Sequence, residues 1–185
     1  LLGILYVIGN ILYSLFLKKF FIIDILFLSG NYLIRLLVGA LIIGALPSKW
    51  LLMAGLLLAL FFILGKRRQE LFFLGESASM HRTNLKDYSL PLLNQYLTIA
   101  GSAFLVVYLL YVFNDSVALV VGNSYLPLTI PFAFYAIFRY FFLIQLDGAK
   151  CDPLENILRD HPLLMSIILW LSAVSIILFG PLPHI

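Results

Sequence analysis

The sequence predicts an all-α, polytopic transmembrane helical bundle. Of the 185 residues, 63% are hydrophobic and only 11% are charged, and the mean hydropathy is +1.06. A soluble domain is about 45–50% apolar and about 25% charged, so this composition excludes a water-soluble globule. Long apolar runs such as residues 51–64 do not alternate polar with apolar residues, as the strands of a transmembrane barrel would. Helices remain, because lipid offers no partner for backbone polar groups.

Six apolar runs approach or exceed the length that crosses a hydrocarbon core, about 17 to 25 residues. We expect the spans at residues 1–17, 20–46, 50–64, 95–113, 128–146 and 163–180. No internal repeat or second domain is visible, so residues 1–185 are interpreted as one transmembrane domain with a polar loop over residues 66–94. The chain starts with Leu1 rather than Met and has no basic flank before its first run. We therefore expect it to begin inside a longer protein.

The basic residues predict the orientation of these spans. Nine of the 12 lie in the first, third and fifth connections: Lys18, Lys19, Lys66, Arg67, Arg68, Arg82, Lys86, Lys150 and Arg159. Only Lys49 lies on the opposite side, and Arg35 and Arg139 lie within spans. Short loops rich in Lys and Arg stay in the cytoplasm. The sequence thus predicts a protein of the cell membrane whose charged face is cytoplasmic, with both ends of this chain on the other side.

Most acidic residues lie on that same face, where Asp24 sits just inside the second span and only Asp115 is opposite. Two interpretations fit: the cytoplasmic side carries the chemistry, or the long loops simply contain the charges. Arg35 follows Asp24 by 11 residues and so lies about 16 Å deeper. A guanidinium there costs at least about 2.5 kcal/mol unless it meets a partner. It either bonds a carbonyl of another helix or holds an anion in a cavity.

The run from Lys66 to Glu70 continues a span into the polar loop and places Lys66 and Glu70 on one helical face. It is either an anchor at the membrane surface or a phosphate-binding cluster. Arg139 is shallower than Arg35, so it either snorkels to the headgroups or faces a cavity. Residues 71–93 suit a short amphipathic helix or an inert elbow. His81, His161 and Cys151 are isolated, so no zinc site is expected.

Several segments carry a resemblance to a known family. They are residues 13–18, Asp24-Ile25, residues 32–35, Gly39-Ala40, residues 66–71, residues 85–88, Pro131-Phe132, residues 138–140, residues 152–155, residues 158–160 and Trp170. In their order and spacing they resemble the UbiA prenyltransferase superfamily, most closely its decaprenyl-phosphate phosphoribosyltransferase branch. This resemblance covers nearly the whole chain.

Two departures from that superfamily stand out. Its members have about nine spans, and an Asp-rich magnesium motif of NDxxDxxxD type follows the second; no such motif is found in this sequence. If the first span here corresponds to the family's fourth, that motif lies outside this chain, and the chain alone is expected to be inactive. The aromatic prenyltransferases also carry a DxxxD motif in the long loop, and residues 66–94 lack one. Its absence favours the phosphoribosyl branch.

The resemblance implies transfer of 5-phosphoribose from phosphoribosyl diphosphate to a polyprenyl (decaprenyl) phosphate, with Mg²⁺ as cofactor. Fixed cations would neutralise the leaving diphosphate, and no nucleic-acid partner is expected. On the residues that match, Lys18, Lys66, Arg67 and Arg82 are expected to contact donor phosphate, and Arg35 an anionic oxygen deeper in the cavity. Asp24 and Glu70 would orient these cations or the ribose hydroxyls. The remaining candidates for substrate binding are Tyr13, Tyr88, Arg139 and Asp160.

Two other functions remain open on the sequence. One is a prenyltransferase that uses a prenyl diphosphate and an aromatic acceptor, on the same fold and with the same metal. The other is a transporter or structural membrane subunit in which Arg35 marks a transport path. Secondary transporters often contain paired repeats, and none is visible here. The sequence makes no prediction about the oligomeric state.

Overall fold

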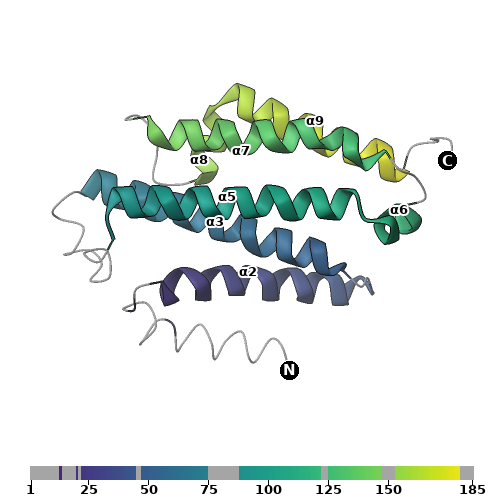
Figure 1. Ribbon diagram of the computed structural model, residues 1–185, viewed down its shortest axis with the longest axis horizontal. Helices are drawn as coiled ribbons and strands as arrows, with labels where there is room; N and C mark the ends of the chain where they lie inside the picture. The colour runs from purple at the N-terminus through teal and green to yellow at the C-terminus, as the bar shows by residue number, and fades with distance from the viewer. Residues whose placement is uncertain are drawn as a thin grey trace. The chain divides into compact units, whose positions relative to one another are not determined.

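The computed structural model describes Tyr13, Phe20 and residues 22–44, 47–74, 88–121, 125–146 and 153–179. In these ranges all regular structure is helical (Figure 1). Five helical segments are long and apolar enough to cross a membrane: Ile23–Ile42, Lys49–Phe73, Leu90–Val112, Leu126–Gln145 and His161–Phe179. The predicted all-α, polytopic membrane bundle is therefore confirmed. Apart from Tyr13, the first predicted span, residues 1–17, lies outside the described residues.

Contacts divide the chain into two compact units, Leu1–Phe104 and Leu105–Ile185. In the first, α2 (Ile23–Ile42) packs along α3 (Lys49–Leu74), and the two run antiparallel because a short link joins them. Gly55 allows the close approach, since a Cβ atom there would lie 3.0 Å from Leu36 Cδ1. Small residues permit such packing between membrane helices. The Ser48 hydroxyl caps α3 by accepting the Leu51 N–H at 3.1 Å.

Helix α3 extends ten residues beyond the predicted end of its span at Leu64. Its 26 residues measure about 39 Å at about 1.5 Å each, more than the roughly 30 Å of the hydrocarbon core. The run from Lys66 to Glu70 is thus the last part of a helix rather than a loop. Similarly, α5 (Leu90–Val112) starts five residues before the predicted Gln95, where Ser89 Oγ accepts the Leu92 N–H at 3.3 Å. Of the predicted amphipathic segment, residues 75–87 lie outside the described ranges.

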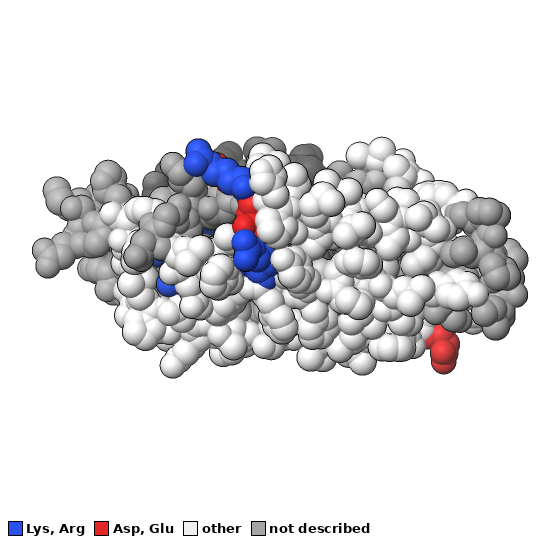
Figure 2. All heavy atoms as spheres, turned by 90° about the horizontal axis from the view of Figure 1, so that it is seen from above, with Lys and Arg blue, Asp and Glu red and all other residues white. Residues whose placement is uncertain are grey.

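The second unit contains the end of α5, two short helices that the sequence did not predict, and two spans. The short helices are α6 (Asp115–Val121) and α8 (Pro153–Arg159). The spans are η4 (Leu126–Thr129) continuing as α7 (Ile130–Gln145), and α9 (His161–Phe179), which packs on α7. Figure 2 shows a largely white surface on which most blue and red spheres gather in one short line. This is expected where helix flanks face acyl chains.

A chain of hydrogen bonds ties three helical segments of this unit together. Trp170 Nε1 donates to the Tyr108 hydroxyl at 2.7 Å, and that hydroxyl lies 2.6 Å from Thr129 Oγ1. Because the Thr129 hydroxyl donates to the Leu126 carbonyl at 2.6 Å, the Tyr108 proton points to Thr129. Tyr108 and Thr129 are buried. Each hydroxyl in the chain donates one bond and accepts another, so buried polar groups do not destabilise the apolar interior here.

Candidate functional site

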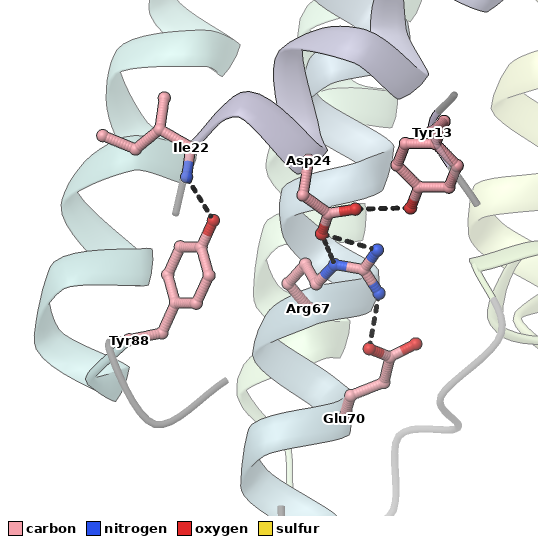
Figure 3. Close-up of polar contacts among 6 residues, drawn as sticks. All are labelled: Tyr13, Ile22, Asp24, Arg67, Glu70 and Tyr88. Atoms are coloured by element: carbon pink, nitrogen blue, oxygen red, sulfur yellow. Dashed lines mark hydrogen bonds and ion pairs between the residues drawn. The ribbon is translucent and has the colours of Figure 1, made fainter. Parts of the chain in front are cut away.

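The main polar feature of the first unit is an ion pair between α2 and α3. Arg67 Nε donates to Asp24 Oδ2 at 3.0 Å, and Arg67 Nη2 lies 2.9 Å from the same oxygen (Figure 3). The side chains are only 3% and 0% exposed, respectively. Asp24 is in the first turn of α2 and Arg67 is near the end of α3, so the antiparallel packing brings them to one end of the helix pair. Each charge compensates the burial of the other.

Two more described side chains join this cluster, which we call the Arg67 network: Tyr13, Asp24, Arg67 and Glu70. Arg67 Nη1 donates to Glu70 Oε2 at 2.6 Å, and the Tyr13 hydroxyl donates to Asp24 Oδ1. The Tyr13 ring also stacks on Phe27, with ring centroids 5.2 Å apart. Figure 3 shows Asp24 and Glu70 on opposite sides of the guanidinium.

Tyr88 supports the network indirectly, by fixing the start of α2. Its hydroxyl accepts the Ile22 N–H at 3.1 Å, and its side chain is buried. Ile22 has a φ of 65°, which is unusual for a β-branched residue and costs about 1–3 kcal/mol. Burial raises the pKa of Tyr88, so its phenol stays neutral and remains able to donate as well as accept. Tyr88 thus helps to position Asp24 through the backbone at the start of α2.

Arg68 is a buried cation that the sequence pattern does not distinguish as a site residue. Its Nε donates to Asn94 Oδ1 at 2.7 Å and joins α3 to α5, and its side chain is only 8% exposed. Gln69 is buried as well. The three successive buried residues, Arg67, Arg68 and Gln69, point in different directions around the helix. This part of α3 is therefore covered by protein on several sides. An anchor at the membrane surface would keep its guanidinium groups exposed, and Arg67 and Arg68 do not.

Lys66 and Arg35 lie apart from the Arg67 network. Lys66 is exposed, although it precedes Arg67 directly. Arg35 is also exposed, about 16 Å along α2 from Asp24, with its Cζ 5.7 Å from the centre of the Tyr32 ring. The structure therefore does not gather Arg35, Lys66 and Arg67 around one buried point. Their contacts with a substrate stay predictions, as do those of Lys18 and Arg82, which lie outside the described residues.

In the second unit, Arg139 and Asp160 form a bidentate pair between the end of α7 and the start of α9. The distances are 3.1 Å from Nε to Oδ1 and 2.8 Å from Nη2 to Oδ2. The Arg139 Cζ lies 5.3 Å from the centre of the Phe142 ring. Asp160 Oδ1 also caps α9 by accepting the Leu163 N–H at 2.8 Å. The hydrogen bond from Arg139 lowers the pKa of Asp160, so that carboxylate is ionised at neutral pH.

Three curated proteins from different organisms are similar to this chain, and all are named decaprenyl-phosphate phosphoribosyltransferase. The Mycobacterium tuberculosis protein is 29% identical over 177 residues, which are 95% of this chain and 57% of that protein. The Mycolicibacterium smegmatis protein is 28% identical over 178 residues, 92% of this chain and 55% of that protein. The Corynebacterium glutamicum protein is 28% identical over 155 residues, 83% and 46% of the respective lengths. The resemblance to the phosphoribosyltransferase branch is confirmed.

The chain spans about half the length of these phosphoribosyltransferases. No protein-family model matches it. The similarity nevertheless runs over most of the chain, so both units described above take part in it. The activity in the relatives' name belongs to their whole chains, and this chain matches one part of each.

A magnesium ion is the cofactor that the phosphoribosyltransferase resemblance implies, and the described residues do not fit one. Among them no three His, Cys, Asp or Glu side chains come close enough together to hold a metal ion. Asp24 and Glu70 both bind Arg67, so their oxygens already have a cationic partner. The network is instead suited to holding one guanidinium rigidly at the end of two membrane helices.

Proposed function

We propose that the protein containing this chain is a membrane transferase that moves 5-phosphoribose from phosphoribosyl diphosphate to a polyprenyl phosphate. The relatives' shared name supports both the phosphoribosyl group and the lipid phosphate acceptor. The observation that carries the proposal within this chain is the buried Arg67, fixed by Asp24 at the end of two spans. That end lies at the boundary where a water-soluble donor meets a lipid acceptor.

The proposed orientation follows from the distribution of basic residues. Lys66, Arg67 and Arg68 follow one another at the end of α3, whereas Lys49 begins that helix at the other membrane surface. By the positive-inside rule, the end that holds the Arg67 network faces the cytoplasm. Phosphoribosyl diphosphate would reach it from there, and the lipid phosphate would reach it along the bilayer surface of the cell membrane.

The proposed reaction breaks one bond and forms one. The bond between the anomeric carbon and the diphosphate breaks, the diphosphate leaves with the bonding electrons, and an oxygen of the lipid phosphate bonds to that carbon. Negative charge develops on the leaving group, and preorganised cations stabilise it. We assign this role to Arg67, with Lys66 as an exposed cation beside it. Asp24 acts as a positioning residue, because its two bonds set the plane of the guanidinium.

Magnesium belongs to the proposal only as a companion of the donor's diphosphate. Hard oxygen ligands suit this ion, and the described residues give it no site. No step above is routed through the metal. What these residues contribute is a fixed cation and the carboxylates that hold it.

Label transfer in membranes that contain the natural, full-length protein tests the proposal. The donor carries a radioactive ribose, and the polyprenyl phosphate phase is extracted and counted. We expect label in the lipid, and we expect Arg67→Ala to lower kcat/KM at least about tenfold, as the loss of a preorganised donor does. Arg159→Ala is the matched control, because Arg159 is 66% exposed and pairs with Glu155 on the surface of α8. It should change the rate less than about twofold.

Three results would replace this proposal with another. Undiminished turnover of Arg67→Ala at equal expression would remove Arg67 from the site. Consumption of a prenyl diphosphate, with no ribose label in lipid, would establish the prenyltransferase alternative. Flux of a solute across proteoliposomes without covalent change would favour a transporter.

A further inference from the structure

The two carboxylates that hold Arg67 differ in how firmly they are fixed. Asp24 is 0% exposed and belongs to another helix, and two nitrogens of Arg67 converge on its Oδ2. Glu70 is 20% exposed, sits one turn further along α3, and accepts a hydrogen bond from Arg67 Nη1 at 2.6 Å. Figure 3 shows it on the side of the guanidinium away from Asp24. Asp24 is thus an inner partner, and Glu70 an outer one that borders on solvent.

A buried guanidinium needs an anion or another acceptor on each side, since unmet N–H groups are costly to bury. Glu70 meets this need at Nη1. Glu70 is partly exposed whereas Asp24 is fully buried, so a stronger anion reaches and displaces Glu70 first. Phosphate oxygens bind Arg with the same geometry as carboxylate oxygens and carry more charge. The released Glu70 would remain hydrated, on the same helical face as exposed Lys66.

We infer that the Nη1 side of Arg67, occupied by Glu70 in this structure, is a binding position for an oxygen of a diphosphate group. Glu70 holds the position until the ligand arrives and then moves out. The identity of the ligand rests on the proposed function, whose donor and leaving group both contain a diphosphate. Glu70 therefore competes with the substrate for Arg67 instead of binding it.

The test is calorimetric titration of inorganic diphosphate into the purified full-length protein, in detergent at fixed ionic strength. Glu70→Gln keeps the size of the side chain and removes its charge, so diphosphate should bind about threefold to tenfold more tightly. When Arg67 is already replaced by Ala, adding Glu70→Gln should not increase the affinity for diphosphate. Glu70→Asp, which keeps the charge, should restore weaker binding. In the transfer assay, Glu70→Gln should lower the KM for the donor.

Glu155→Gln is the matched control. Glu155 pairs with Arg159 within one helix, at 2.8 Å, and the pair is largely exposed. The variant removes the same charge from the protein, so a gain of equal size there would mean general electrostatics and would overturn the inference. Unchanged or weaker binding by Glu70→Gln would overturn it too. If ribose label enters lipid and Glu70→Gln gains nothing, only this inference fails; if Glu70→Gln gains affinity and no label enters lipid, only the proposed function fails.

Discussion

Breaking the pair of Asp24 and Arg67 should destabilise the first unit strongly. Asp24→Asn leaves a guanidinium that is 3% exposed with Glu70 as its remaining carboxylate. Arg67→Met leaves a carboxylate that is 0% exposed with the Tyr13 hydroxyl. Removing one member of a buried pair costs about 3–5 kcal/mol because the other charge stays buried. We expect a loss of about 3 kcal/mol for each variant, since the charge that stays behind keeps at least one partner.

The double variant Asp24→Asn with Arg67→Met removes both charges. Its free energy of unfolding should therefore fall by much less than the sum of the two single losses. We expect a coupling energy of about 2–3 kcal/mol, at the upper end for residues in direct contact. The free energy of unfolding would be measured by adding sodium dodecyl sulfate to protein in mixed micelles. Tryptophan fluorescence reports the transition, because Trp50 lies in the first unit near the start of α3.

The same cycle on Glu155 and Arg159 is the control. These side chains are 43% and 66% exposed, so their coupling should stay below about 0.5 kcal/mol. Additive losses for Asp24 and Arg67, within about 0.5 kcal/mol, would refute the reasoning that the two charges compensate each other's burial.

Three further predictions concern contacts outside that pair. Asn94→Leu should lower the free energy of unfolding by about 1–3 kcal/mol in the same micelle assay, because the Nε–H of buried Arg68 loses its acceptor; an unchanged value would contradict this. Tyr108→Phe should cost a similar amount, since it interrupts the hydrogen-bond chain of the second unit, and a loss no larger than that of an exposed Tyr135→Phe would count against it. Asp160 has a lowered pKa in the folded protein, so its pair with Arg139 stabilises the fold above about pH 4 and loses that effect as the pH falls further. As the pH is lowered below about 4, the melting temperature should fall less in Asp160→Asn than in the unchanged protein. An equal fall in both proteins would contradict the prediction.

The existence of the spans could be predicted from the sequence, because a long apolar run in lipid must form a helix to satisfy its backbone hydrogen bonds. Their ends could not, since polar residues do not end a helix where protein covers them. Arg67, Arg68 and Gln69 read as the start of a loop, yet they are buried within α3. The short helices α6 and α8 carry too few residues to give a periodic signal.

The candidate site was predicted as a set of residues but not as a set of contacts. Arg67 and its partner Asp24 are 43 residues apart in the sequence, and no local pattern joins them. One signal was available: two antiparallel spans place the first turn of one beside the last turns of the other. Asn94 offered a weaker signal, as one of two adjacent amides with Gln95 near the start of an apolar helix, 26 residues from Arg68. The exposure of Arg35 could not be predicted from the sequence, because a single charged residue in a span can face either the interior of the bundle or its surface.

A donor with two labels tests the proposed transfer most directly. Phosphoribosyl diphosphate carries carbon-14 in its ribose and phosphorus-32 in its diphosphate, and is incubated with polyprenyl phosphate and membranes containing the full-length protein. Transfer of phosphoribose predicts carbon-14 in the extracted lipid and phosphorus-32 in the water phase, in equal amounts. If both labels stay in water, or both enter the lipid together, the protein does not catalyse this reaction.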